Sequence, residues 1–265
     1  MKLRKHFRLH GLVGIFLVLC MILCINAGAS NAQHWYCKRT QDHSQPQLDT
    51  DMQWICKSDC VYVDKKHATQ EQEKVIYLTF DAGYENGNVA KIMDVMCKHQ
   101  VKGAFFILGN LIDRNPELVK RMADEGHLVC NHTYTHKDIT RMTAQEIESD
   151  LKRLESAYTD LTGKAMSKYF RPPEGTFDVA SLKAVSDCGY KTVFWSFAYA
   201  DWDNGKQMSA QNAQKKIMDN LHNGEIMLLH PTSATNAQIL SDVIVELKSL
   251  GYRFGTLDEL DFDAS

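Results

Sequence analysis

Two histidines four residues apart, His132 and His136, are the strongest local indication of chemistry in this sequence. On a helical turn, residues i and i+4 share one face, so both imidazoles could reach a single ion. Neutral imidazole is a ligand that suits zinc and similar divalent metals. An isolated pair with this spacing is often two polar loop residues, but this pair directly follows a predicted strand. The spacing therefore predicts a divalent metal site.

A carboxylate and another imidazole end two further apolar runs of the chain. Asp81 follows the run 74–80, and His230 follows the run 225–229. A carboxylate leaving a buried strand is costly unless it is paired or catalytic. A helix N-cap is the plainer alternative for Asp81, but the next helix is predicted to begin too late, near Asn86. We expect Asp81 to act as a general base, and His230 to protonate a leaving amine unless it is a purely structural histidine.

The segment 171–175 follows another predicted strand and begins with an arginine. Arg171 could fix the orientation of Asp81. Two prolines stiffen the loop behind it, and a rigid loop can aim a backbone N–H, such as that of Glu174, at a developing oxyanion. An ordinary surface turn with a solvated arginine is the alternative.

The pair Asp201-Trp202 follows yet another predicted strand. Asp201 could pair with Arg171 or with His230. Trp202 offers an apolar wall for an acetyl methyl group or a sugar face, although plain core packing is an equal alternative from the residues alone.

Predicted strands and helices alternate from residue 74 onward, which implies parallel strands with helical crossovers. The strands cover residues 74–80, 104–108, 127–130, 168–170, 191–197, 225–229 and 252–257. A barrel and an open doubly wound sheet both fit this alternation. Polar residues follow five different strands, which favours a closed or nearly closed barrel, because an open sheet gathers its site at one switch point.

The first 32 residues have the layout of a secretory leader: basic residues between Lys2 and Arg8, an apolar run over 12–25, and then small residues. The apolar run is short for a membrane span of ~20 residues. We predict a signal peptide cleaved after Ala29 or Ala32, with an uncleaved N-terminal membrane anchor as the alternative. The protein is then secreted or anchored on the outer face of the membrane. Residues 33–73 are predicted to be a polar extension, and residues 74–265 the catalytic domain.

Composition narrows the classes of partner. The chain has 265 residues, a formal net charge of -3 and no basic cluster outside the leader, which argues against nucleic-acid binding. Contact with a membrane is expected only through the leader, if it is uncleaved. Export permits disulfides between cysteines, and we expect a link among Cys37, Cys56 and Cys60.

The five polar segments, in this order, resemble the polysaccharide deacetylases of carbohydrate esterase family 4 over about residues 74–258. The resemblance implies an α/β fold, a distorted (β/α) barrel of about seven parallel strands. It also implies a role for each matching residue: Asp81 as base, His132 and His136 as metal ligands, Arg171 as orienter of the base, Trp202 in the acetyl groove and His230 as acid. Asp201 completes the predicted catalytic set.

One position departs from the pattern of that family. Most members have a second aspartate directly after the base, as third metal ligand, and here that position is Ala82. The segment 79–88 instead resembles the muramic-acid deacetylase branch, which also lacks this aspartate. We therefore expect a divalent ion, zinc in the first instance, that is weakly bound. The predicted substrate contacts are Asn88, Glu174, Trp202 and Leu229.

The resemblance implies a metal-dependent hydrolase that removes the N-acetyl group from N-acetylmuramic acid in peptidoglycan strands and releases acetate. In that branch the reaction is a step toward muramic δ-lactam in spore cortex. Two alternatives stay open. One is deacetylation of N-acetylglucosamine in peptidoglycan or chitooligosaccharides, and the other is a glycan-binding protein with a decayed site.

Overall fold

The computed structural model describes residues 32–40, 42–68 and 73–262 of the chain. The predicted leader lies outside these residues. Among the helices of the described part, none is both long and apolar enough to cross a membrane.

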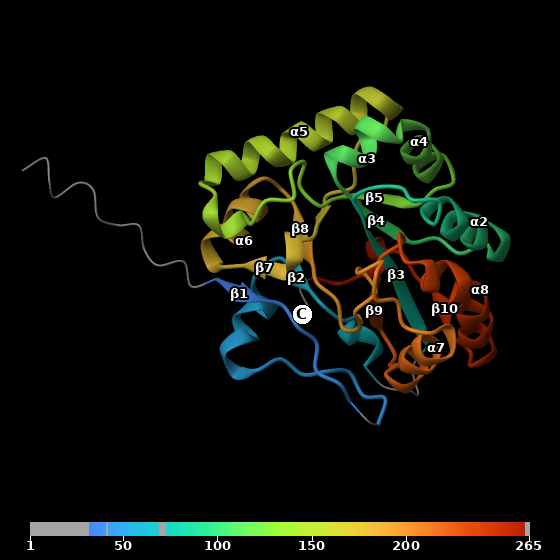
Figure 1. The fold of residues 1–265 in the computed structure, drawn as a ribbon. Helices are drawn as coiled ribbons and strands as arrows, with labels where there is room; N and C mark the ends of the chain where they lie inside the picture. Colours follow the sequence, from blue (N-terminus) through green and yellow to red (C-terminus); the bar gives the residue numbers. More distant parts are fainter. Residues whose placement is uncertain (1–31, 41, 69–72, 263–265) are drawn as a thin grey trace, which may run out of the picture. The chain divides into compact units, whose positions relative to one another are not determined.

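A parallel sheet curls through the centre of the domain, and helices cover its outer side (Figure 1). Its strands run in the spatial order β10, β3, β4, β5, β6, β8, β2, and β9 also pairs with β3. Their bounds are β2 Cys60–Val61, β3 Val75–Ala82, β4 Ala104–Ile107, β5 Leu128–Asn131, β6 Tyr169–Phe170, β8 Lys191–Val193, β9 Glu225–Leu229 and β10 Arg253–Phe254. Isolated bridges join Val63 to Glu225 and Phe197 to Met227, and so connect the two ends of the curl. The prediction of a distorted (β/α) barrel is confirmed.

The residues of β3 alternate between two apolar clusters, because successive side chains of a strand point to opposite faces. Ile76, Leu78 and Phe80 pack in the cluster that includes residues of the outer helices. Val75 and Tyr77 pack inside the curl, in a cluster built from strand and loop residues. This alternation explains why β3 is an almost unbroken apolar run, as expected for a parallel strand covered on both faces.

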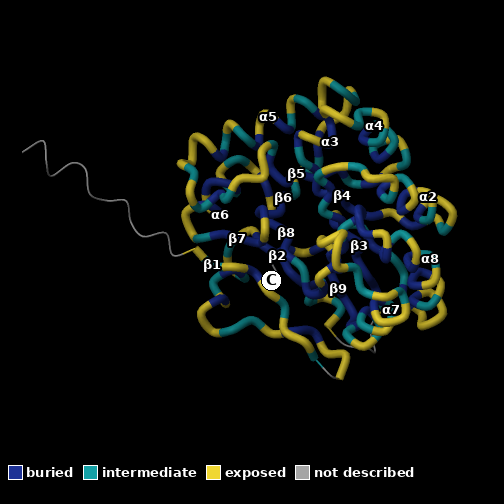
Figure 2. The backbone as a smooth tube through the Cα atoms, viewed as in Figure 1, coloured by how far each residue is buried: buried dark blue, intermediate teal, exposed yellow. Residues whose placement is uncertain are grey.

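The long helices carry their apolar residues on the side that faces the sheet, so burial is concentrated inward and exposure outward (Figure 2). Their bounds are α2 Val89–His99, α3 Gly109–Arg114, α4 Pro116–Asp124, α5 Ala144–Thr162, α6 Val179–Asp187, α7 Ala210–Asp219 and α8 Ala234–Ser249. Thr143 and Glu146 form a capping box at the start of α5. Short 3₁₀ turns cover η1 Thr50–Lys57, η2 Lys65–His67, η3 Ile139–Arg141, η4 Pro173–Gly175 and η5 Leu257–Glu259.

The extension before the catalytic domain is more than a polar segment. Its strand β2 pairs with β8 and becomes an edge of the curled sheet, and β1 (Gln33–His34) pairs antiparallel with β7 (Thr176–Phe177). Trp35, Ile55 and Tyr62 are buried in an aromatic cluster with residues of the barrel. The segment therefore supplies a strand and a layer of core to the barrel.

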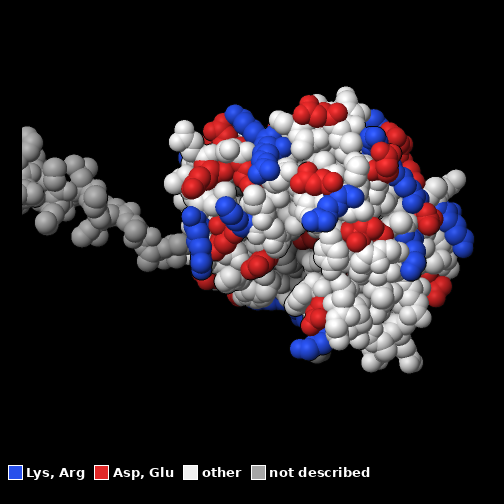
Figure 3. Space-filling view, turned by 45° about the horizontal axis from the view of Figure 1, so that its top comes forward, with Lys and Arg blue, Asp and Glu red and all other residues white. Residues whose placement is uncertain are grey.

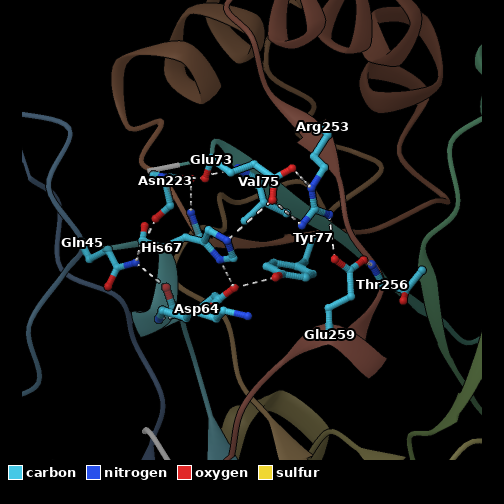
Figure 4. A network of polar contacts seen from close by, with 12 residues as sticks. Gln45, Asp64, His67, Glu73, Val75, Tyr77, Asn223, Arg253, Thr256 and Glu259 are labelled. Carbon is cyan, nitrogen blue, oxygen red and sulfur yellow. Dashed lines mark hydrogen bonds and ion pairs between the residues drawn. The ribbon is translucent and has the colours of Figure 1, made fainter. Parts of the chain in front are cut away.

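A polar network ties the extension to the start of β3 (Figure 4). The carboxylate of Asp64 accepts hydrogen bonds from the Tyr77 hydroxyl at 2.6 Å and from His67 Nδ1 at 2.6 Å. The side chain of Gln45 donates to the carbonyls of Asp64, at 2.7 Å, and of Asn223, at 2.9 Å. These buried bonds hold the extension against the end of the barrel opposite the carboxyl ends of the strands.

The disulfide expected among Cys37, Cys56 and Cys60 is not formed in this structure, in which all the described cysteines are free thiols. The three residues belong to different elements. Cys60 lies buried in β2 and Cys56 lies on η1, while Cys37 lines the cavity described below.

Candidate active site

A cavity of about 880 Å³ opens where several strands end, within the size range of ~300–1,000 Å³ common for small-molecule sites. Six residues singled out in the sequence line it: Asp81, His132, His136, Glu174, Trp202 and His230. They come from the end of β3 and from segments that follow β5, β6, β8 and β9, as the barrel prediction requires.

Arg171 is the buried anchor of this site. Its side chain is fully buried, and its guanidinium donates to Asp81 Oδ1 at 2.9 Å and to Thr79 Oγ1 at 2.9 Å. It also donates to the carbonyl of Val193 at 2.9 Å, and it lies 4.1 Å from the centroid of the Phe106 ring. The arginine thus links β3 to β8 and fixes one carboxylate oxygen of Asp81.

Asp81 remains ionised although it is largely buried. Burial favours the neutral acid, but the charge of Arg171 outweighs it and lowers the pKa of Asp81 below its ordinary value. The second oxygen, Oδ2, is 3.6 Å from His132 Nε2. An ionised carboxylate with one oxygen fixed and the other facing an imidazole is suited to accept a proton from water.

His132 is held in the tautomer that a metal ligand needs. Its Nδ1 lies 2.8 Å from the carbonyl oxygen of Arg171, which can only accept, so Nδ1 carries the proton and Nε2 keeps its lone pair. Burial lowers the pKa of His132 to about 4, so the ring is neutral at pH 7. The ring centroids of His132 and His136 are 5.1 Å apart. A histidine that donates its other N–H to a carbonyl is the common arrangement around bound metals.

The segment between the two histidines is a loop, so the predicted helical turn is wrong. Thr133 and His136 have φ values of 71° and 57°, in the left-handed region. Such a conformation costs ~1–3 kcal/mol for a residue other than glycine and is typical of functional sites. Two hydrogen bonds oppose this strain: Thr133 N donates to Asn131 Oδ1 at 2.9 Å, and His136 N donates to Thr133 Oγ1 at 2.8 Å.

Two supports of this loop could not be found from the sequence. Asp150 of α5 accepts from the backbone N–H of Tyr134 at 2.6 Å and from the Thr135 hydroxyl at 2.9 Å. Gly109 lies against the Tyr134 ring, where an added Cβ would be 2.6 Å from ring carbons. Neither residue lies in a motif, so only the fold shows that they hold the histidine loop.

His230 is hydrogen-bonded to a carboxylate other than Asp81, that of Asp201. Its Nδ1 is 2.7 Å from Asp201 Oδ1, and its backbone N–H donates to Asp201 Oδ2 at 2.8 Å. Asn236 donates to the same Oδ2 at 2.6 Å, so the buried Asp201 is fully bonded. Burial disfavours the imidazolium, but the Asp201 hydrogen bond and charge outweigh it and raise the pKa of His230. Of the two partners considered for Asp201, the structure places His230 beside it.

Replacing Asp201 by asparagine should make the enzyme lose activity at a lower alkaline pH than the wild type. The proposed acid must be protonated, and Asp201 raises the pKa of His230, so losing this carboxylate lowers that pKa and moves the alkaline limb of kcat/KM to lower pH. At pH 7 we expect a loss of roughly tenfold or more, up to the ~10²–10⁴-fold that proton transfer contributes. A kcat/KM profile between pH 5 and pH 9 measures this. Asp203→Asn, an exposed neighbouring change, should leave the limb in place, and an unmoved limb in Asp201→Asn would contradict the pairing.

Trp202 is not a core residue. Its side chain is 61% exposed at the cavity, with the ring centroid 6.2 Å from that of His230. Glu174 also lines the cavity, in the strained turn η4, where its φ is 56°. These positions suit a wall that contacts substrate.

Two predicted substrate contacts lie elsewhere. Leu229 is buried in the cluster that faces the helices, and its neighbour Leu228 lines the cavity instead, because side chains alternate along β9. Asn88 is outside the cavity lining and donates to the carbonyl of Thr232 at 3.0 Å. Asn88 therefore supports the loop that follows His230.

The extension supplies part of the cavity wall, which the sequence did not indicate. Trp35, Tyr36, Cys37 and Arg39 line the cavity together with the predicted residues. The segment carries no recognisable motif. Its aromatic residues are the only hint that it packs on the barrel.

Comparison with known proteins decides the family. A model described as "Polysaccharide deacetylase" matches residues 68–193. The Bacillus subtilis protein named peptidoglycan-N-acetylmuramic acid deacetylase PdaA is 38% identical over 93% of this chain and 95% of its own length. The chain belongs to the polysaccharide deacetylase family. The solved structure of Bacillus subtilis PdaA, described as a family 4 carbohydrate esterase, has a TM-score of 0.82 and 39% identity, over 89% of this chain and 99% of that one.

A second kind of polysaccharide deacetylase is also similar. The Listeria monocytogenes peptidoglycan-N-acetylglucosamine deacetylase PgdA is 35% identical over 71% of this chain, which spans 39% of that protein's length. Both relatives are deacetylases, and this chain is an enzyme of the same family.

Enzymes of the polysaccharide deacetylase family depend on a metal ion, and this site fits such an ion in part. His132 presents a neutral ring with a free Nε2, and His136 lies beside it. Ala82 is fully buried in the cluster that faces the helices and contributes packing but no ligand. Among the residues that the structure describes, no group of three or more histidine, cysteine or carboxylate side chains surrounds one point. Two imidazoles are thus available to an ion, without a third protein ligand of the usual kind.

Proposed function

We propose that this enzyme removes the N-acetyl group from N-acetylmuramic acid residues of peptidoglycan. One observation carries the proposal: an ionised Asp81 and a His230 of raised pKa line the same cavity as the two imidazoles, each held by a separate buried partner. Binding alone would need no such acid and base, which counts against a glycan-binding protein with a decayed site. The 38% identity with a relative named for muramic acid, together with Ala82, favours this sugar over glucosamine.

The residues divide the hydrolysis between them. A divalent ion held by His132 and His136 would supply Lewis-acid polarisation of water and of the amide carbonyl. Asp81 takes the proton of the attacking water, and Arg171 keeps its carboxylate in place. We assign to the backbone N–H of Glu174, a residue that lines the cavity, the stabilisation of the oxyanion that develops at the carbonyl. His230 then gives a proton to the sugar nitrogen as the C–N bond breaks, and acetate and a free amine are released.

Weak metal binding is the expected consequence of Ala82. Two imidazoles without a carboxylate ligand should bind zinc with a Kd of about 1 µM or weaker, which is a binding free energy no more favourable than about −8.2 kcal/mol. Isothermal titration of the metal-free protein with zinc measures this affinity. His136→Ala is the control and should remove the binding, while nanomolar affinity in the wild type would contradict the proposal.

The proposed site of action is the cell wall. The leader predicted at residues 1–32 would export the chain or anchor it on the outer face of the membrane, where peptidoglycan strands are its partner. Acidic and basic side chains are interspersed on the surface shown in Figure 3, which does not suit a polyanion partner. Deacetylation also frees the amine that a muramic δ-lactam requires, so a step toward spore cortex is part of the proposal.

Mass spectrometry of enzymatically digested peptidoglycan tests the choice of sugar. After incubation with the enzyme and a divalent ion, we expect loss of acetyl from muramic acid residues. Loss of acetyl from glucosamine residues alone would instead show that the enzyme is a peptidoglycan N-acetylglucosamine deacetylase. An unchanged digest, with tight binding of glycan strands, would support the binding protein.

A further inference from the structure

The segment 35–39 is fixed firmly against the barrel where it lines the cavity. Trp35 donates from its backbone to the carbonyl of Gly175 at 2.8 Å and from Nε1 to the carbonyl of Trp195 at 2.9 Å. Its ring stacks on Phe194, with centroids 4.3 Å apart. The wall is therefore a preformed part of the site, and the side chains that follow Trp35 are held in place beside the cavity.

Arg39 brings a cation to this wall. It is exposed, lines the cavity, donates from Nη2 to the carbonyl of Ala198 and lies 4.9 Å from the centroid of the Phe197 ring. One hydrogen bond and one ring contact hold the guanidinium while most of its five N–H donors remain for a ligand. Lys38, its neighbour, does not line this cavity and is paired with Asp49.

No carboxylate neutralises Arg39 among the residues that the structure describes. None of their ion pairs includes it, and Glu225, a fully buried residue of β9, interacts with Arg39 without a direct ion pair. Burial raises the pKa of Glu225 well above its ordinary value, which favours the neutral acid. The cavity thus holds a cation without an ion-pair partner, while Asp81, which lines the same cavity, is paired with Arg171.

The two amino sugars of peptidoglycan differ in one charged substituent. Both carry the acetamido group on C2, but only muramic acid carries a lactyl ether on the adjacent C3, which ends in a carboxyl group. That group is a free carboxylate in unsubstituted muramic acid, and it is an amide bearing further carboxylates where a peptide is attached. Arginine is the side chain best matched to a carboxylate, because its planar donors bind both oxygens at once.

We infer that Arg39 forms a carboxylate subsite in the wall of the cavity and selects muramic acid through its C3 substituent. The inference rests on the proposed function and names the residue that distinguishes its substrate. A carboxylate there binds Arg39 while the neighbouring acetamido group lies toward Asp81 and His230. Glucosamine has no carboxylate on C3, so the Arg39 guanidinium stays solvated when glucosamine is bound.

Three matched oligosaccharides test the subsite. Their muramic acid residues carry the free lactyl carboxylate, its methylamide, or the same carboxyl coupled to L-alanine. Acetate release gives kcat/KM on each for the wild type, Arg39→Gln, Arg39→Lys and the control Lys38→Gln, with the thermal midpoint as a check of folding. The wild type should prefer the free carboxylate over the methylamide by roughly tenfold to a hundredfold, the usual worth of a hydrogen-bonded charge.

The Arg39→Gln variant should lose that preference, chiefly through KM on the free carboxylate, and should match the wild type on the methylamide. Arg39→Lys should keep part of the preference, and Lys38→Gln all of it. If the wild type is as active on the alanyl substrate as on the free acid, the subsite also accepts the peptide carboxylate. If its activity on the alanyl substrate is as low as on the methylamide, the subsite accepts only the carboxylate of the lactyl group. An equal loss on all substrates, or no loss, overturns the inference. Failure of the wild type to deacetylate any muramic acid substrate would instead overturn the proposed function.

Discussion

Asp81→Asn should abolish nearly all acetate release while the barrel stays folded. Asparagine keeps the size of the side chain and an oxygen for the Arg171 guanidinium, but it cannot take a proton from water. We expect turnover to fall by at least ~10²–10⁴-fold, the contribution of a positioned general base. A steady-state acetate assay with saturating divalent ion measures the loss, and circular dichroism measures the fold.

The matched control for that variant is Asp242→Asn, on the exposed side of α8. It makes the same chemical change away from the cavity, and both turnover and fold should remain as in the wild type. If Asp81→Asn kept turnover within a few-fold of the wild type, Asp81 would not be the base.

Arg171→Met should destabilise the protein and inactivate it together. The guanidinium is fully buried and bonded to Asp81, Thr79 and the carbonyl of Val193, and its loss leaves a largely buried carboxylate unpaired. Breaking one side of a buried ion pair costs ~3–5 kcal/mol. Urea unfolding, followed by fluorescence, gives the change in the free energy of unfolding.

A second arginine provides the comparison for that measurement. Arg141 also pairs with an aspartate, Asp138, at 3.1 Å, but its side chain is 84% exposed. Arg141→Met should change the free energy of unfolding by no more than about 1 kcal/mol, because exposed pairs contribute little. Equal effects of the two substitutions would show that burial is not what makes Arg171 important.

The sequence predicts the strands that are long, or whose apolar runs are clear. Each of the seven predicted strands has a counterpart in the structure, from β3 to β10. The strand β2 was not predicted, because a pairing of two residues, Cys60 and Val61, is shorter than any periodicity can reveal.

The candidate site is predictable to the extent that it lies at strand ends. Parallel strands in a barrel end at the same mouth, so polar residues directly after them, such as Asp81 and His230, converge whatever their distance along the chain. Partners that reach the site from elsewhere carry no such sign. Asn236 of α8 and Asp150 of α5 are ordinary polar helix residues in sequence, and only folding places them behind His230 and the histidine loop.

The conformation of the histidine loop shows a different limit of sequence reasoning. A spacing of four suggests a helical turn, but hydrogen bonds to Asn131, Thr133 and Asp150 stabilise left-handed residues that local propensity disfavours. Tertiary contacts therefore determine the backbone conformation of this segment. The two imidazole rings lie close together in a loop and not on a helical turn.

Acetate release from a muramic acid oligosaccharide, measured before and after chelation, tests the central claim most directly. A site in which acid and base act on either side of an ion held by two imidazoles should lose activity on chelation. Added divalent ion should restore the wild type but not His132→Ala. Full activity in the presence of chelator, or equal restoration of that variant, would contradict the account.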